Sequence, residues 1–275
     1  MLIPMMRRTD DLFDSMYERI IFSGSYYKGT KVGEPDEFDL DLILKLPISY
    51  DKIKIDTNHH RYGYVKIALD KYLFEEKYRT IISRWVTDQG RLNQNEFRQW
   101  MQGIFTKVYN QLPPATPGPD YLISIGRSGP AFPVEITTPD RTVISVDLVP
   151  ALEFVNVPLG NGYKHLNGDK KNWLAVAKPL DGDQMEERTL WRLCFYEQEK
   201  DFLKNNLNGE IKPVIRMLKK FRDTQDWKAL CSYFIETIFY HMLEKSYTNK
   251  SQSLAHSSRT SVFMQVSSNY LLYLV

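Results

Sequence analysis

The stretch Gly24–Pro47, "GSYYKGTKVGEPDEFDLDLILKLP", places three acids at alternating positions directly before an apolar run. The alternation of apolar residues from Phe38 to Leu44 predicts a half-buried strand. On such a strand the side chains of Glu37 and Asp39 point to the same face, roughly 7 Å apart. Burying two like charges is unfavourable unless a cation lies between them, and Mg²⁺ or Mn²⁺ prefers carboxylate oxygens. The segment therefore predicts a metal site, and a solvated edge strand with an acidic outer face is the alternative.

Two further features favour the metal site. Gly24 and Ser25 form a small turn just upstream of the strand, and such a turn can present backbone N–H groups to phosphates. A later apolar run, "RTVISVDLVPAL", contains one isolated acid, Asp147, which is unfavourable in a buried strand unless it joins the same cluster. A phosphate-binding turn beside metal-binding acids is the arrangement that nucleotidyl transfer needs.

The composition limits the class of protein. The chain has 275 residues, of which 43% are hydrophobic, so it can bury a substantial core. The net charge is only +2, so a nucleic-acid surface would have to be a local patch. The two cysteines, Cys194 and Cys231, form no CxxC pair, so we expect neither a disulfide scaffold nor a structural zinc ion. We found no signal-peptide pattern and no run of about 20 apolar residues, and we therefore expect a cytoplasmic protein without membrane contact.

The order of patterns along the chain predicts an α+β protein with two lobes. We expect helices over residues 10–21 and 95–112, a loop over 113–119 and strands within 120–126, 131–137 and 141–154. The β-rich part is expected to end near residue 180, and mostly helical segments to follow from residue 186. The predicted N-lobe, residues 1–182, is a mixed β-sheet with flanking helices. The predicted C-lobe, residues 183–275, is helical.

The spacing of these motifs resembles known families. Gly24 and Ser25, then Glu37-Phe38-Asp39, then a remote Asp147 resemble the hG[GS], [DE]h[DE] and third-acid pattern of the nucleotidyltransferase superfamily. Four longer blocks resemble the Mab-21 and cyclic GMP-AMP synthase family, and within it the insect cyclic GMP-AMP synthase-like receptors. They are "GSYYKGTKVGEPDEFDLDLIL", "ISVDLVPALE", "TLWRLCFYEQEK" and "LCSYFIETIFYHMLEK". The similarity extends from about residue 22 to residue 245.

This resemblance implies a two-lobed nucleotidyltransferase fold and an activity. Family members use two Mg²⁺ or Mn²⁺ ions to make a cyclic dinucleotide of the cyclic GMP-AMP type from ATP and GTP. The metal-binding and catalytic acids would be Glu37, Asp39 and Asp147, with Asp147 nearest the acceptor hydroxyl. Asp41 matches no catalytic position, and we expect a solvated or structural role for it, although a register that pairs Asp39 with Asp41 remains an alternative.

The resemblance also assigns the nucleotide contacts. On the acceptor side, Arg192 would contact the guanine nucleotide together with Asp147. Lys219 is our first choice for a basic residue at the donor phosphates and Arg216 the second, and Lys28 and Lys31 lie in the turn where they could attract a triphosphate. The donor site would comprise Ser25, Glu37, Phe38, Asp39, Tyr196, Glu197, Gln198, Glu199, Lys219, Ser232 and Tyr233. One position departs from the family, because Glu236 stands where a lysine is frequent.

The activating ligand is inferred from the same family. The segment "EKDFLKNNLNGEIKPV" lacks the clustered His and Cys of a zinc thumb, so the resemblance favours double-stranded RNA over double-stranded DNA as the ligand. The resemblance also implies a role in innate antiviral defence and oligomerisation on the ligand. Relative to the family, the helical lobe would be C-terminally shortened. The alternative is a catalytically silent Mab-21-like module that binds nucleotides or proteins. Candidate RNA-binding residues are Lys164, Lys170 and Lys171, with Lys178, Lys52, Lys54, His59, His60 and Arg61 as further basic positions.

Overall fold

The computed structural model describes residues 2–57, 61–112, 121–126, 131–159, 172–180, 187–204 and 211–240. The strands are β1 (Tyr17–Ser23), β2 (Glu37–Leu44), β3 (Lys54–Asp56), β4 (Tyr64–Ala68), β5 (Leu122–Ile125), β6 (Phe132–Thr137), β7 (Val143–Val155), β8 (Asn172–Val176) and β9 (Leu190–Cys194). The helices are α1 (Leu2–Thr9), α2 (Asp11–Met16), α3 (Gly24–Lys28), α4 (Glu76–Trp85), α5 (Gln94–Tyr109), α6 (Tyr196–Lys204) and α7 (Ile211–Thr224). Residues 232–240 are also helical.

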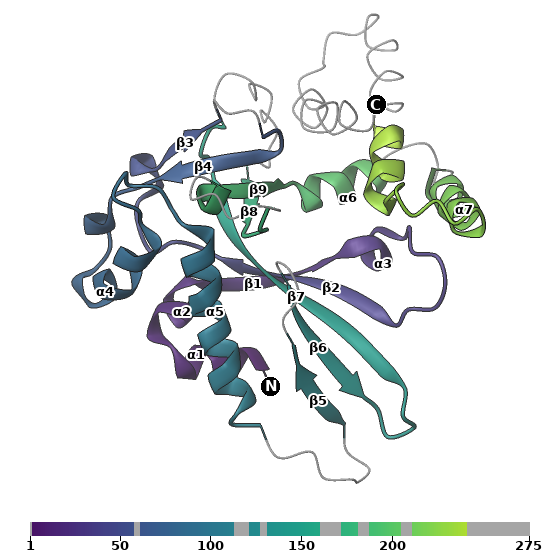
Figure 1. Cartoon of the computed structure of the whole chain (residues 1–275), viewed down its shortest axis with the longest axis horizontal. Coiled ribbons are helices and arrows are strands. Elements are labelled where there is room, and N and C mark those ends of the chain that lie inside the picture. Colours follow the sequence, from purple (N-terminus) through teal and green to yellow (C-terminus); the bar gives the residue numbers. More distant parts are fainter. Residues whose placement is uncertain are drawn as a thin grey trace, which may run out of the picture.

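The described strands form one mixed sheet with the order β1-β2-β7-β8-β9-β4-β3 (Figure 1). The long strand β7 organises it: residues 145–152 pair in parallel with β2 on one side, and on the other side residues 143–148 pair antiparallel with β6 and residues 151–155 pair antiparallel with β8. Strand β5 pairs with β6. The mixed sheet with flanking helices and a helical part beside it confirms the predicted α+β, two-lobed fold class.

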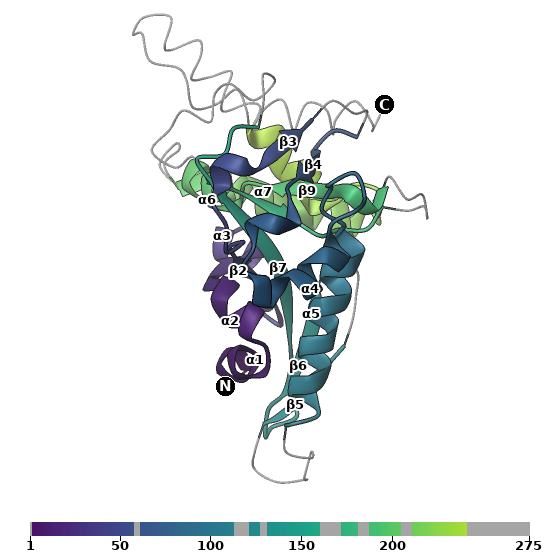
Figure 2. The same cartoon turned by 90° about the vertical axis from the view of Figure 1, so that its left-hand side faces the viewer.

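One face of the sheet is covered by α1, α2, α4 and α5, which build the main hydrophobic core (Figures 1 and 2). Helix α5 confirms the helix predicted over residues 95–112, and it starts after Asn93, whose side chain accepts a hydrogen bond from the backbone N–H of Asn95. The Phe97 ring of α5 packs 5.3 Å from the rings of both Trp85 and Trp191. This aromatic contact joins α4, α5 and β9.

The opposite face carries a second, smaller core. Ile43 of β2 and Ala151 of β7 pack there with Tyr196 of α6. A third core lies within the helical part, where Leu203, Ile215 and Tyr240 bring α6, α7 and the helix at 232–240 together. In both views α3 lies beside α6 and α7 (Figures 1 and 2). The second core thus joins the sheet to α6, and the third core packs α6 against the other helices of the lobe.

The helix predicted over residues 10–21 is wrong in its second half. Helix α2 ends at Met16, and Tyr17–Ser23 forms strand β1. The apolar spacing of this segment fits a helix, but β1 pairs antiparallel with β2, with Phe22 opposite Leu40. Strand pairing satisfies the backbone of β1, and this tertiary contact outweighs the local helical pattern.

The prediction that the β-rich part ends near residue 180 is also wrong. Leu190–Cys194 forms β9, which lies between β8 and β4 in the sheet. The segment from residue 186 was expected to be mostly helical, but residues 190–194 pair as a strand. Trp191 of this strand is fully buried in the main core. The segment begins with a single 3-10 turn at Glu187–Thr189, and its α-helix α6 starts only at Tyr196. The lobe boundary at residue 182 stays a prediction. None of the described helices has the length and apolar character that a bilayer crossing requires.

Candidate active site

The three predicted catalytic acids lie on one face of the two central strands. Asp39 of β2 is directly opposite Asp147 of β7 in the parallel register, and Glu37 lies two residues before Asp39 on the same face. Registered positions on neighbouring strands are about 4.8 Å apart. The strand pairing therefore brings together side chains that are more than a hundred positions apart in the sequence.

The pKa values of Asp39 and Asp147 respond to the neighbouring charges. Burial raises the pKa of Asp39, and the negative charges of Glu37 and Asp147 raise it further, while Lys31 and Lys28 oppose this. Burial and the charge of Glu37 also raise the pKa of Asp147. The charges of Glu37 and Asp147 thus disfavour the ionised form of Asp39, and the charge of Glu37 disfavours that of Asp147, as expected for a site that gains from a bound cation.

Gly24 lies against the Asp39 carboxylate. A Cβ atom at Gly24 would stand 1.7 Å from Oδ2 of Asp39, and the Gly24 φ of +77° favours glycine in addition. The predicted turn is a short helix, α3, which begins at Gly24. The half-buried Ser25 follows Gly24 within α3, and the Ser25 carbonyl accepts a hydrogen bond from the Thr30 amide, 2.8 Å away. The start of α3 therefore lies directly against one of the predicted acids.

The donor set fits a hard divalent cation by its chemistry. Glu37, Asp39 and Asp147 supply only carboxylate oxygens, which Mg²⁺ and Mn²⁺ prefer. Lys31 lies 3.8 Å from Glu37, and it also pairs with the exposed Asp36 at 3.1 Å. Within the described part of the chain, no three Asp, Glu, His or Cys side chains already meet the geometry of a metal site. The residues that could hold a metal are therefore present on one face, without a preformed coordination shell.

Asp41 differs from the other three acids because it is buried, with 6% of its surface exposed. The solvated role considered for it is therefore wrong, and a structural role remains. Burial raises its pKa to about 7, the Asp39 charge adds to the shift, and the neighbouring Ser23 hydroxyl opposes it.

Replacing Asp41 by Asn is expected to stabilise the metal-free protein in a pH-dependent way. The folded-state pKa of about 7 lies above the ordinary value of 3.8, so the folded state holds its proton more tightly than the unfolded state. The native aspartate therefore destabilises the fold increasingly as the pH rises from about 4 to about 7. The gain in urea midpoint of Asp41→Asn, measured with EDTA, should be larger at about pH 8 than at about pH 5. Equal gains at both pH values would contradict the assignment.

The residues predicted for base binding gather at the junction with the helical lobe. The Tyr233 hydroxyl donates a hydrogen bond to Oε1 of Glu199, 3.2 Å away. The Arg192 guanidinium lies over the Tyr233 ring, 5.8 Å from its centroid. Strand β9, α6 and the helix at 232–240 thus bring three predicted residues into direct contact.

Other predicted residues make separate contacts. Phe38 points to the sheet face opposite Asp39, where its ring packs edge-on against Tyr26 at 4.9 Å. Glu197 pairs with Arg19 at 3.3 Å. Tyr196 packs in the second core, and the Gln198 amide donates a hydrogen bond to the Asn172 carbonyl. The Ser232 hydroxyl accepts a hydrogen bond from Arg222 at 3.0 Å.

Lys219 and Lys28 belong to a buried ion-pair network that the sequence did not reveal. The Lys219 ammonium lies 2.6 Å from Oε1 of Glu236. Lys28, expected in a turn, ends α3 and is 6% exposed, with its ammonium 2.5 Å from Glu199. Arg216 is exposed and donates a hydrogen bond to the Gly29 carbonyl at 2.7 Å.

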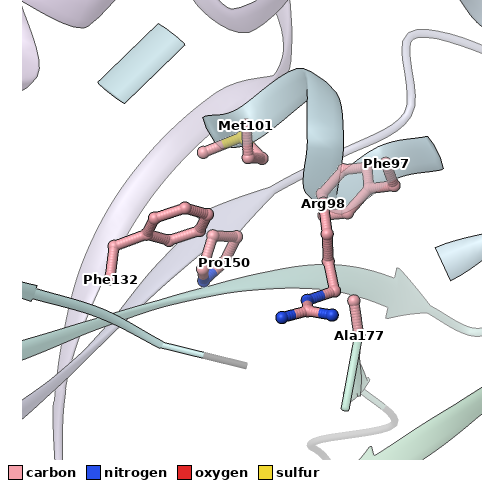
Figure 3. Close-up of a pocket in the computed structure, with 6 residues that line it drawn as sticks. All are labelled: Phe97, Arg98, Met101, Phe132, Pro150 and Ala177. Carbon is pink, nitrogen blue, oxygen red and sulfur yellow. The ribbon is translucent and has the colours of Figure 1, made fainter. Parts of the chain in front are cut away.

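A small pocket beneath α5 lies away from the acids. Arg98 of α5 extends between Pro150 of β7 and Ala177, and three apolar side chains of Phe97, Met101 and Phe132 complete the lining (Figure 3). Pro150 differs from Asp147 by an odd number of positions on β7, so the pocket is on the opposite face of the sheet.

Several predicted basic residues lie outside the described residues. Lys164, Lys170 and Lys171 fall in 160–171, and His59 and His60 fall in 58–60. Among the described ones, Arg61 pairs with Glu187 at 3.1 Å. The predicted C-terminal shortening concerns residues after 240, which also lie outside the described part.

Comparison with known proteins gives two domain matches and a set of similar proteins. Residues 26–205 match the Mab-21 protein nucleotidyltransferase domain, and residues 210–270 match the Mab-21 protein HhH/H2TH-like domain. The chain is 40% identical to a cyclic GMP-AMP synthase-like receptor of Trichogramma pretiosum over 275 residues, which cover 96% of the chain and 56% of that receptor.

Two further insect proteins with the same name are similar. The receptor of Microplitis demolitor is 35% identical over 264 residues, which cover 92% of the chain and 49% of the receptor. The receptor of Nicrophorus vespilloides is 36% identical over 257 residues, which cover 92% of the chain and 70% of the receptor. The chain thus spans about half the length of the Trichogramma and Microplitis receptors. With its nucleotidyltransferase and C-terminal domain matches and these relatives, the chain belongs to the Mab-21 and cyclic GMP-AMP synthase family.

Proposed function

We propose that the protein is a metal-dependent nucleotidyltransferase that makes a cyclic dinucleotide of the cyclic GMP-AMP type from ATP and GTP. The observation that carries the proposal is the register of β2 and β7, which sets Asp39 opposite Asp147 with Glu37 on the same face. The contact of Gly24 with the Asp39 carboxylate supports it, because it places the Gly-Ser backbone beside the acids.

The chain's own residues have distinct roles in this proposal. Glu37, Asp39 and Asp147 would hold two Mg²⁺ or Mn²⁺ ions. When bound, the metals neutralise the triphosphate and lower the pKa of the attacking hydroxyl. Ser25 would bind the donor phosphates through its hydroxyl and amide, and the carboxylate of Asp147 would face the acceptor hydroxyl.

The base-binding side of the proposal rests on the contact between Tyr233 and Arg192. Tyr233 would stack on the donor base, a contact worth about 1–3 kcal/mol per base. Arg192, which lies over that ring, would reach the guanine nucleotide on the acceptor side. The predicted donor residues of α6, Tyr196 to Glu199, border this junction.

We further propose that a nucleic acid activates the enzyme in innate antiviral signalling. The relatives are named receptors, and double-stranded RNA is the ligand we favour over DNA. Such RNA is recognised through its shape and phosphates, for which Lys164, Lys170 and Lys171 are the proposed contacts, with oligomerisation on the ligand. The free cysteines Cys194 and Cys231 suit the reducing cytoplasm.

The test is incubation of the protein with labelled ATP and GTP and with Mg²⁺ or Mn²⁺. Double-stranded RNA, double-stranded DNA or no nucleic acid is added in separate arms. Product is expected with RNA and should be lost in the Asp39→Ala, Asp147→Ala double variant. Product that persists in the double variant would refute the catalytic assignment, and equal product in every arm would refute the sensor role. Nucleotide binding without product in any arm would favour the silent module.

A further inference from the structure

A buried network of two lysines and two glutamates lies between the sheet and the helical lobe. The Lys28 ammonium lies 2.5 Å from Oε2 of Glu199 and 3.0 Å from Oε2 of Glu236. The Tyr240 hydroxyl is 3.5 Å from the same ammonium. Lys28 is 6% exposed and Glu236 4% exposed, so water screens these charges little. The lysine bridges α3 to α6 and to the helix at 232–240.

Lys219 extends the network from α7. Its ammonium has three N–H donors, and three acceptors surround it: Oε1 of Glu236 at 2.6 Å, the Thr30 carbonyl at 3.2 Å and the Thr30 hydroxyl at 3.3 Å. The Thr30 hydroxyl also contacts Oε1 of Glu236 at 2.7 Å. In this arrangement the hydrogen-bonding capacity of Lys219 is used within the protein. Glu236 therefore holds both lysines and the segment that follows α3.

The network connects the two ends of the proposed donor site. Gly24 begins α3 and touches the Asp39 carboxylate, while Lys28 ends α3 and binds Glu199. The Tyr233 hydroxyl donates to the other oxygen of the Glu199 carboxylate. A continuous series of contacts thus extends from Asp39 through α3 to the tyrosine proposed to stack on the donor base.

We propose that Lys28 is a positioning residue for the donor nucleotide, which clamps α3 to the helices that carry Glu199 and Glu236. The proposal rests on the proposed function. The clamp would set the spacing between the acids, where the triphosphate binds, and Tyr233, where the base binds. A donor nucleotide can contact both ends at once only when this spacing is correct. Ion pairs suit such a task because buried polar partners accept one arrangement rather than many.

The first test separates positioning from stability. Lys28→Met should raise the donor KM about tenfold while kcat and the acceptor KM change little, because binding to the two ends is lost equally in the ground and transition states. The variant should also lower the melting temperature, since it leaves the Glu199 carboxylate buried without its lysine. Lys220→Met is the control, because it removes the exposed lysine that directly follows Lys219 in α7. It should change neither the donor KM nor the melting temperature.

A double variant makes the distinction sharp. Lys28→Met combined with Glu199→Gln removes the unpaired carboxylate, so the melting temperature should recover while the donor KM stays raised. A donor KM that recovers together with the melting temperature would reduce Lys28 to a structural residue and overturn the proposal. An unchanged donor KM in Lys28→Met would overturn it as well.

Hydrogen exchange in the nucleotide-free protein tests the clamp without any activity. Amides of residues 24–30 and 232–240 should exchange faster together in Lys28→Met and in the double variant, but not in Lys220→Met. Unchanged exchange in both segments would overturn the clamp even if the enzyme is active. If the wild type forms no product in any arm, the proposed function fails, and faster exchange would still establish the clamp as a contact between the lobes.

Discussion

Asp39→Asn and Asp147→Asn are each expected to lower the rate of nucleotidyl transfer by about three orders of magnitude. The two carboxylates face each other across β2 and β7, and each would be a ligand of the proposed metal site. Metal ions contribute several kcal/mol of transition-state stabilisation, and each 1.4 kcal/mol or so corresponds to a tenfold change in rate. The measurement is kcat for product formation from labelled ATP and GTP.

The same substitutions should not destabilise the metal-free fold. Burial raises the pKa of Asp39 and of Asp147, so the charged carboxylates are unfavourable in the folded state at neutral pH. A neutral amide removes this repulsion, and the melting temperature in EDTA should stay equal or rise. Asp36→Asn is the matched control, because Asp36 is exposed and pairs only with Lys31 in the described contacts. Its kcat should stay near the wild-type value, and a kcat near wild type in Asp39→Asn would contradict the catalytic role.

Gly24→Ala is expected to abolish most of the activity while costing only modest stability. The new methyl group would stand 1.7 Å from Oδ2 of Asp39, so the carboxylate must rotate away. The positive φ of +77° adds a backbone penalty of roughly 1–2 kcal/mol for any residue with a Cβ atom. We expect a loss in kcat of about a hundredfold, since small misplacements of a reacting group can have effects of that size.

Gly33→Ala provides the matched control for this substitution. Gly33 has a similar φ of +86°, but no atom lies within 4 Å of an added Cβ. Both variants should lose similar stability in urea unfolding, and only Gly24→Ala should lose kcat. Equal activity losses in the two variants would show that backbone strain, rather than the contact with Asp39, is responsible.

The strand pattern around the acids could be predicted from sequence because it is local. The alternation through Leu40 and Leu42 identified β2, and the isolated Asp147 identified an acid that needed partners. The exact register of β2 with β7 could not be predicted from the pattern alone, because a shift by two residues would preserve which face each side chain occupies. The resemblance to the family implied only that Glu37, Asp39 and Asp147 share one metal site, and the pairing of Asp39 with Asp147 comes from the structure.

Other features depend on contacts that no local pattern contains. Segment Tyr17–Ser23 has helical spacing, and only its pairing with β2 makes it a strand. The partners of Lys28 are Glu199 and Glu236, which lie 171 and 208 positions later. A lysine four residues after a glycine in a polar segment is typical of a solvated turn, so its burial was not predictable. One hint of this network was present in the sequence, because Glu236 stands where a lysine is frequent in the family.

Manganese binding, followed by electron paramagnetic resonance, tests the central claim most directly. Wild-type protein with a non-hydrolysable ATP analogue should bind about two Mn²⁺ ions per chain, as a two-metal nucleotidyl transfer site requires. The Asp36→Asn control should bind the same number. The Asp39→Asn, Asp147→Asn double variant should lose this bound manganese, because the opposed carboxylates would be its ligands. Wild-type stoichiometry and affinity in the double variant would contradict the account.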